Sequence, residues 1–166
     1  MVGLAEVLPF PVLRYNPESV PDLDAVISPP YDIISPADQK RIHEKHALNA
    51  IHLDFGLETP DDNDQRNRYT RAAATLEAWV DNGVLQPEDR PALYLCREDF
   101  LLGDGSTTSR EGFIALVRLA DFSEGVVLPH AETPSGPKQD RLRLLQATGA
   151  NRNAPHCLSP HSGQPY

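Results

Sequence analysis

Sixteen prolines are spread over the 166 residues of the chain, about twice the share of roughly 5% that is usual in proteins. Each proline fixes φ and lacks a backbone N–H, so it breaks the interior of a helix. Six of them lie in the first thirty residues, at positions 9, 11, 17, 21, 29 and 30. This pattern predicts short helices and strands joined by ordered loops, and it argues against a bundle of long helices.

Charge and composition narrow the class further. The chain has 15 lysines and arginines against 24 aspartates and glutamates, which gives a net charge of −9. Sequence-independent binding to nucleic acid needs a basic face, so we do not expect direct nucleic-acid binding. Hydrophobic residues make up 40% of the chain, enough to form the core of one domain.

The sequence has no recognisable targeting or membrane-spanning segment. Glu6 interrupts the first apolar stretch and the first basic residue is Arg14, unlike the pattern of a signal peptide. No apolar run approaches the ~20 residues that a membrane-spanning helix needs. Cys96 and Cys157 are far apart and fit reduced thiols. We therefore expect a cytoplasmic protein without a membrane partner.

Periodicity and capping residues predict two clear helices. Ser35 and Pro36 form a typical helix start, and that helix should end near His46. A second helix should cover residues 69–80, with Trp79 in the core and Asn82-Gly83 at the end. Its apolar stripe consists of Tyr69, Ala72, Ala73, Leu76 and Val80. Short strands are predicted at residues 12–15, 25–27 and 50–53.

The later part of the chain predicts a β-hairpin followed by a helix. A strand from residue 92 to Phe100 should turn at Gly103-Asp104-Gly105 and return over residues 112–119. Another short strand is predicted at residues 126–128. The last helix should begin at Pro137 and turn Leu142, Leu145 and Leu144 inward. The whole pattern indicates an α/β or α+β fold, with a mixed, curved sheet and two or three flanking helices.

The strongest candidate site is the segment from Pro129 to Arg141. Free N–H groups at a helix start carry partial positive charge, and Gly136 would let a ligand approach the backbone. Lys138 and Arg141 are three residues apart, on one helix face, and together could hold a phosphate or carboxylate. The preceding loop contains His130 and Glu132 as an acid/base pair, and Thr133 as a further phosphate ligand. The alternative is a solvated helix start in which both cations pair with surface acids.

Two other segments carry weaker signals. The corner at Pro29-Pro30 could present Tyr31 and Asp32 to a ligand, or it could hold a buried tyrosine and an Asx turn. His43 and His46, at spacing i and i+3, lack a third metal ligand. His156, Cys157 and His161 are of types that bind metals, but they lie in the expected tail. No metal site is predicted from these residues. The Gly103–Ser106 stretch lies between two strands and is read as a hairpin turn, not a phosphate loop.

Three stretches of the sequence carry a family resemblance. They are Val26-Ile27-Ser28-Pro29-Pro30-Tyr31-Asp32-Ile33-Ile34-Ser35, the run from Gly112 to Leu119, and Leu128-Pro129-His130 followed by Ser135-Gly136-Pro137-Lys138-Gln139-Asp140-Arg141-Leu142. In order and spacing they resemble the bacterial domain-of-unknown-function family 1015, from about residue 8 to residue 150. The family is similar to the ParB-like and sulfiredoxin-like nucleotide-binding fold, which includes free-serine kinases.

The resemblance implies a function without fixing it. It implies a nucleotide- or phosphometabolite-binding part of a small-molecule kinase or phosphotransferase, using ATP or ADP with Mg²⁺, for which Asp140 or Asp32 would be a ligand. A small phosphorylated ligand would be the partner. The alternatives are a non-enzymatic regulatory or partner-binding module and an inactive, truncated remnant.

Two departures from the family pattern qualify that reading. Family members carry His-Glu-x-Thr, whereas here the order is His130-Ala131-Glu132-Thr133, which moves the acid by one residue. Full-length members also have a later Gly-His-His-Arg stretch that this chain does not contain. The expected organisation is therefore the N-terminal part of the family domain over residues 1–150, an aberrant or disordered tail over 151–166, and no turnover by this stretch alone.

Overall fold

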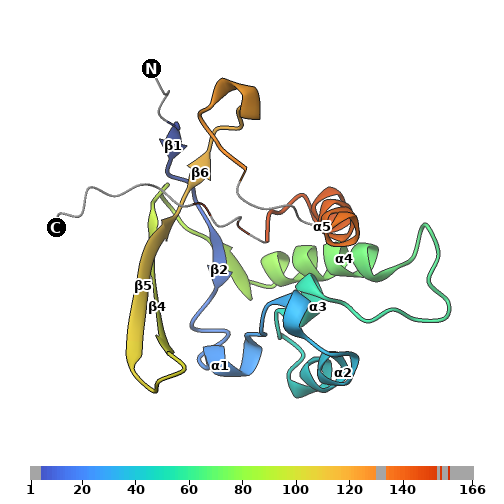
Figure 1. Ribbon diagram of the computed structural model, residues 1–166. Helices are drawn as coiled ribbons and strands as arrows, with labels where there is room; N and C mark the ends of the chain where they lie inside the picture. The colour runs from blue at the N-terminus through green and yellow to red at the C-terminus, as the bar shows by residue number, and fades with distance from the viewer. Residues whose placement is uncertain (1–4, 130–133, 153, 155–156, 158–166) are drawn as a thin grey trace.

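The computed structural model describes residues 5–129, 134–152, 154 and 157 (Figure 1). Short elements alternate with loops along the chain, as the prolines predict. The strands are β1 (Val7–Leu8), β2 (Leu13–Tyr15), β3 (Leu85–Pro87), β4 (Tyr94–Leu101), β5 (Thr107–Ile114) and β6 (Leu116–Val117). The helices are α1 (Leu23–Val26), α2 (Pro36–Lys45), α3 (Ile51–Asp54), α4 (Arg68–Asp81) and α5 (Ser135–Thr148), with 3₁₀ turns at Tyr31–Ile33 and Phe122–Glu124.

The strands form three antiparallel pairs within the described part of the chain. β1 pairs with β6, β2 with β3, and β4 with β5. The β4–β5 hairpin stands on one side of the molecule and the helices gather on the other (Figure 1). The α/β or α+β class is confirmed. Its described strands form three separate two-stranded antiparallel sheets, and α2, α4 and α5 are the three longer helices.

The core lies where α3 and α4 meet the β2–β3 pair. Leu53, Leu76, Trp79 and Leu85 form one buried cluster. Trp79 is 6% exposed, which confirms its predicted place in the core. α4 begins with a capping box. The Asn67 side chain accepts from the N–H groups of Tyr69 and Thr70, and the Thr70 hydroxyl accepts from the N–H of Asn67. The predicted stripe is correct for Ala72 and Leu76, but Val80 at its end is 38% exposed.

Two predicted strands are helical turns in the structure. Residues 25–27 fall in and after α1, where Asp22 caps the turn through its side chain. Residues 50–53 fall largely in α3 because of Asn49, which is fully buried. Its side-chain amide donates to the carbonyls of Ala25 and Ile27, and its oxygen accepts from the N–H of Ile51. This tertiary contact holds two weakly patterned segments in helical form.

The hairpin is confirmed, and its strands differ in extent from the prediction. Gly105 takes φ +83° in the turn, and the Asp104 side chain accepts from Ser106. The return strand begins at Thr107 rather than Gly112, and its last part is a separate strand, β6, paired with β1. Residues 126–128 do not form the expected strand; they follow the 3₁₀ turn that ends at Gly125.

The last helix also begins earlier than predicted. α5 starts at Ser135 with Pro134 as its N-cap, so Pro137 is its third residue. Proline is tolerated there because the first N–H groups of a helix have no intrahelical acceptor. Leu144 is 4% exposed against α4, whereas Leu142 and Leu145 are 46% and 42% exposed. The prediction for Leu142 and Leu145 is therefore wrong. In the described part of the chain, no helix has the length and apolarity to cross a bilayer.

A histidine between α2 and α3 predicts a pH-dependent stability. His43 Nε2 lies 3.1 Å from the carbonyl of Phe55, and its ring contacts the edge of the His52 ring at 4.4 Å. Burial lowers the pKa of His43, with the charge of His52 adding to the effect. The unfolded chain then binds more protons between the folded pKa and the ordinary value of about 6.5. The contribution of His43 to stability should be fully present above about pH 6.5 and should be lost as the pH drops through that window.

Urea unfolding at a series of pH values checks this expectation. The wild-type midpoint should fall between pH 7.5 and pH 5, and His43→Gln should show a smaller fall because it cannot take up the proton. The exposed His46, replaced by Gln, is the matched control and should keep most of the wild-type dependence. Equal pH dependence in the wild type and His43→Gln would contradict the assignment.

Candidate functional site

The start of α5 presents the first group of predicted site residues. Pro134 has no side-chain donor or acceptor, so it cannot cap the free N–H groups of Ser135 and Gly136. Gly136 is exposed, with open space around the position of a Cβ. Lys138 is also exposed, and its side chain has no hydrogen bond or ion pair with another described residue. His130, Glu132 and Thr133 lie outside the described residues.

Arg141 lies in a different environment from Lys138, although both are on one helix. Its guanidinium donates to Asp54 Oδ1 at 2.9 Å and to the Asp54 carbonyl at 3.0 Å, and it also pairs with the neighbouring Asp140. The same group lies 3.9 Å over the ring of Tyr31. The Arg141 side chain is 18% exposed. The structure therefore places Arg141, Asp140 and Tyr31 together and leaves Lys138 in solvent.

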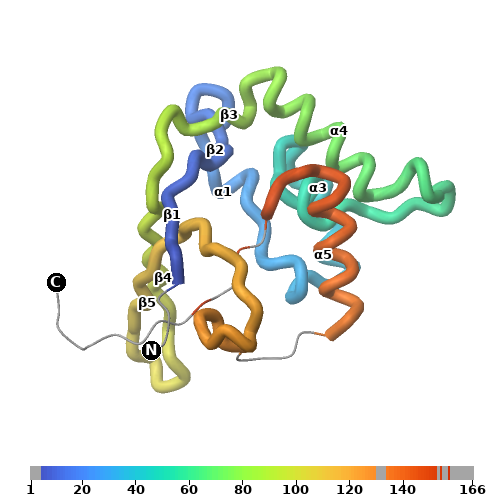
Figure 2. The backbone as a smooth tube through the Cα atoms, turned by 90° about the horizontal axis from the view of Figure 1, so that it is seen from above, coloured from blue at the N-terminus to red at the C-terminus, as the bar shows by residue number. Residues whose placement is uncertain are grey.

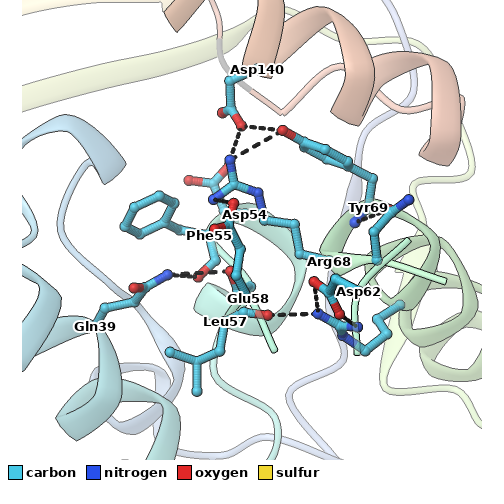
Figure 3. A network of polar contacts seen from close by, with 12 residues as sticks. Gln39, Asp54, Phe55, Leu57, Glu58, Asp62, Arg68, Tyr69 and Asp140 are labelled. Atoms are coloured by element: carbon cyan, nitrogen blue, oxygen red, sulfur yellow. Dashed lines mark hydrogen bonds and ion pairs between the residues drawn. The ribbon is translucent and has the colours of Figure 1, made fainter. Parts of the chain in front are cut away.

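Asp140 joins α5 to the start of α4. It accepts from Arg68 at 2.6 Å and from the Tyr69 hydroxyl at 2.7 Å (Figure 3). Burial alone would raise the pKa of Asp140, but the bonds from Tyr69 and Arg141 hold that pKa below its usual value. Burial alone would lower the pKa of Arg68, but its hydrogen bond to Tyr69 and the charge of Asp140 leave that pKa raised. Both groups are therefore charged at neutral pH.

A third guanidinium comes from the segment after α5. Arg152 Nε is 3.7 Å from Asp54 Oδ1, which makes an ion pair but is too long for a hydrogen bond. This nitrogen is buried and has no hydrogen-bond partner among the described residues. Burial lowers the pKa of Arg152. We call the three arginines, Arg68, Arg141 and Arg152, with Asp54 and Asp140, the guanidinium cluster.

The charges of the guanidinium cluster do not balance. Three guanidiniums share two carboxylates whose side chains are each 15% exposed. A third carboxylate, Glu58, lies 3.4 Å from Arg68. Because it is 71% exposed, solvent screens its charge and it does little to neutralise the cluster. The buried part of the cluster thus carries an excess positive charge.

A pocket of about 180 Å³ opens beside the cluster, between α5 and the segment that follows it. Its polar lining residues are Arg141, Asn151 and Arg152. The remaining walls are apolar: Leu142, Leu144, Leu145 and Ala150. The pocket therefore combines cationic and apolar surface at one place.

The helices around the cluster fix its carboxylates. α2 holds the loop after α3, because Gln39 donates to the carbonyls of Phe55 and Gly56 (Figure 3). Tyr31 and Phe55 pack with ring centroids 6.2 Å apart beside Asp54. α5 crosses and packs against α4 and lies next to α3, which brings Asp140 and Arg141 to the same place (Figure 2).

Of the two candidates at the Pro29-Pro30 corner, Tyr31 joins this arrangement and Asp32 does not. Asp32 is exposed in the 3₁₀ turn, and its side chain makes no bond with another described residue, so the Asx turn considered above does not form. Tyr31 is half-buried, not buried as that alternative expected, and it contacts Arg141. Among the described residues, no group of three or more His, Cys, Asp and Glu side chains is placed to hold a metal ion.

Sequence reasoning missed four members of the site: Asp54, Arg68, Tyr69 and Arg152. Tyr69 was assigned to an apolar stripe, and Asp54 follows a segment read as a strand. The position of Arg68 could have identified it as a candidate. It lies immediately after the helix cap Asn67, where a cation opposes the helix dipole. A cation in that place needs an acidic partner, which turns out to be Asp140.

Comparison with known proteins identifies the family. A family model described as "Protein of unknown function (DUF1015)" matches residues 7–163. The chain belongs to this family. In this DUF1015 chain the match extends past residue 150. The sequence pattern predicts that the family domain ends at that residue, and this boundary stays a prediction. No curated protein and no solved structure gives a significant match.

Proposed function

We propose that the protein binds a small phosphate-bearing molecule at the guanidinium cluster and the adjoining start of α5. The observation that carries this proposal is the excess of buried positive charge among the described residues, none of which accepts a hydrogen bond from Arg152 Nε. A buried cation without full compensation is costly, and an anion supplied from outside would offset that cost. Guanidinium groups also match the geometry of phosphate oxygens, to which they donate in pairs.

Two features at the start of α5 support binding of an oxyanion such as phosphate. The uncapped N–H groups of Ser135 and Gly136 point away from the helix, where oxyanions bind. Lys138 lies one turn before Arg141 and reaches solvent, so it extends the positive surface outward from the cluster.

The size of the pocket bears on the ligand. Pockets that enclose a drug-sized molecule have volumes of about 300–1,000 Å³, and this one has about 180 Å³. A nucleotide such as ATP or ADP would therefore enter with its phosphates and leave its base outside. Mg²⁺ would arrive with those phosphates, since both oxygens of Asp140 are already occupied by Arg68, Tyr69 and Arg141.

The described part of the site offers charge and positioning more than a base. The lowered pKa of Asp140 makes it a weak proton acceptor at neutral pH. Phosphoryl transfer depends mostly on positioning and charge stabilisation, so this arrangement suits the binding half of a phosphotransferase. Proton transfer is proposed for His130 and Glu132, which precede α5 in the sequence.

Calorimetric titration tests the proposal. Inorganic phosphate, phosphoserine, ADP and ATP, with and without Mg²⁺, should include at least one ligand that binds saturably. Affinity should fall as salt rises, because the Lys138 contact is exposed to screening. Lys138→Ala should weaken binding about threefold to tenfold, and Arg152→Gln by more than tenfold, since charged hydrogen bonds contribute roughly 1.5–3 kcal/mol.

The matched control is Arg143→Ala, which removes an exposed cation from the same helix. It should leave affinity unchanged. The proposal is wrong if none of the four ligands binds, or if Arg143→Ala weakens binding as much as Arg152→Gln does. Circular dichroism of each variant excludes a loss of folding as the cause.

A further inference from the structure

The β4–β5 hairpin has an uncovered surface that the proposed function does not use. Fourteen of its sixteen strand residues are exposed, all except Tyr94 and Thr108. A two-stranded hairpin is at best marginally stable in water unless a further strand or helix packs on it. Leu95 is 90% exposed, Leu101 74% and Phe113 57%. Such a surface needs a partner.

The register of the hairpin places these side chains on one face. Side chains alternate along a strand, so Leu95, Arg97, Asp99 and Leu101 point to the same side of β4. Their partners on β5 are Phe113, Glu111, Ser109 and Thr107. This face, which we call the Leu95 face, is apolar at both ends and charged in the middle.

The pattern on β4 is complementary to itself. Under a two-fold axis that crosses the strand at Glu98, Leu95 of one copy faces Leu101 of the other, and Arg97 faces Asp99. The same axis places Phe113 on β5 opposite Thr107. Each charged contact then occurs twice, as in an isologous interface. In this arrangement, no like charges of the Leu95 face meet between β4 of one copy and β4 of the other.

The opposite face of the hairpin is less suited to such a contact. Tyr94 there is anchored to the rest of the molecule, donating to the carbonyl of Phe10 and accepting from the N–H of Val12. Glu98 and Arg110 on that face already pair with each other across the strands. The hairpin itself stands apart from the longer helices (Figure 1), and on the Leu95 face Leu95 is 90% exposed.

We infer that two copies of the chain associate by packing their Leu95 faces together, antiparallel and face to face. Arg97 of each copy pairs with Asp99 of the other, and the leucines at both ends are removed from water. Within one chain Arg97 lies 3.0 Å from Asp99 and 3.8 Å from Glu111, so the charges in the middle are already ordered for this contact. The inference is independent of the phosphate proposal.

Sedimentation equilibrium over about 1–200 μM tests the interface. The wild type should rise with concentration toward twice the 18.3 kDa of one chain. Arg97→Asp places acids opposite Asp99 and should abolish the dimer, as should Asp99→Arg for the reverse reason. Equal mixtures of the two variants should recover a dimer, because each Asp then faces an Arg of the other chain.

The mixture distinguishes an interface from a folding effect, since neither variant alone regains its pairing within the chain. Glu18→Arg, which changes an exposed acid outside the hairpin, is the control and should keep the dimer. A wild-type monomer at all concentrations would overturn the inference and leave another protein or another segment as the partner of this face. A dimer that persists in both single variants, or no recovery in the mixture, would overturn it equally.

Discussion

Asp140→Asn is expected to lower the free energy of unfolding by about 3 kcal/mol, because it leaves buried cations without their counter-charge. Arg68 and Arg141 both donate to this carboxylate, and an asparagine in its place would turn an N–H₂ donor toward at least one of them. Urea unfolding followed by circular dichroism measures the change. Asp89→Asn, at an exposed position, is the matched control and should change stability by less than about 0.5 kcal/mol.

The outcome also bears on the site. If Asp140→Asn costs no more than Asp89→Asn, the guanidinium cluster does not hold α4 and α5 together as described. The lowered pKa of Asp140 gives a further signature, with its sign set by linkage. Its contribution to stability is present above the ordinary value of about 3.9 and is lost as the pH falls through the folded pKa. The difference between wild type and Asp140→Asn should therefore shrink in acid.

Trp79→Ala is expected to have the second large effect, a loss of about 3–5 kcal/mol. The side chain is 6% exposed and packs with Leu53, Leu76 and Leu85, so its removal opens a cavity that the neighbours cannot fill. Val80→Ala, at the next position on the same helix, should cost less than about 1 kcal/mol, because Val80 is 38% exposed. Thermal or urea unfolding of the two variants compares a buried and a half-exposed apolar residue directly.

This comparison can also fail in a definite way. The sequence pattern places both Trp79 in the core and Val80 in the apolar stripe of α4, whereas the structure buries Trp79 and leaves Val80 38% exposed. Equal losses for the two variants would favour the stripe over the structure. A larger loss for Val80→Ala would contradict the described packing outright.

Capping and periodicity were enough to predict the longer elements. Ser35 with Pro36 marks the start of α2, and the spacing of Ala72 and Leu76 identifies α4, because these signals are local. The segments at residues 25–27 and 50–53 were misread because their form depends on Asn49, whose side chain joins them across more than twenty residues. No local pattern carries that information.

The candidate site could be predicted only in part, because its contacts also join residues that are distant in sequence. Arg141, Asp140 and Tyr31 could be singled out one by one, but their partners are distant in sequence. Asp140 meets Arg68 across 72 positions, and Arg141 meets Asp54 across 87. Sequence spacing placed Lys138 and Arg141 on one face and could not show that one is solvated while the other is buried in ion pairs.

The central claim is that the guanidinium cluster binds phosphate, and the Nε–H groups of its arginines report on it most directly. Two-dimensional ¹H–¹⁵N spectra of these groups, recorded while inorganic phosphate or ADP is added at constant ionic strength, should show the Arg152 signal shifting saturably. The signal of the exposed Arg143 should stay in place. An Arg152 signal that does not move, or equal shifts of both signals in proportion to added anion, would contradict the account.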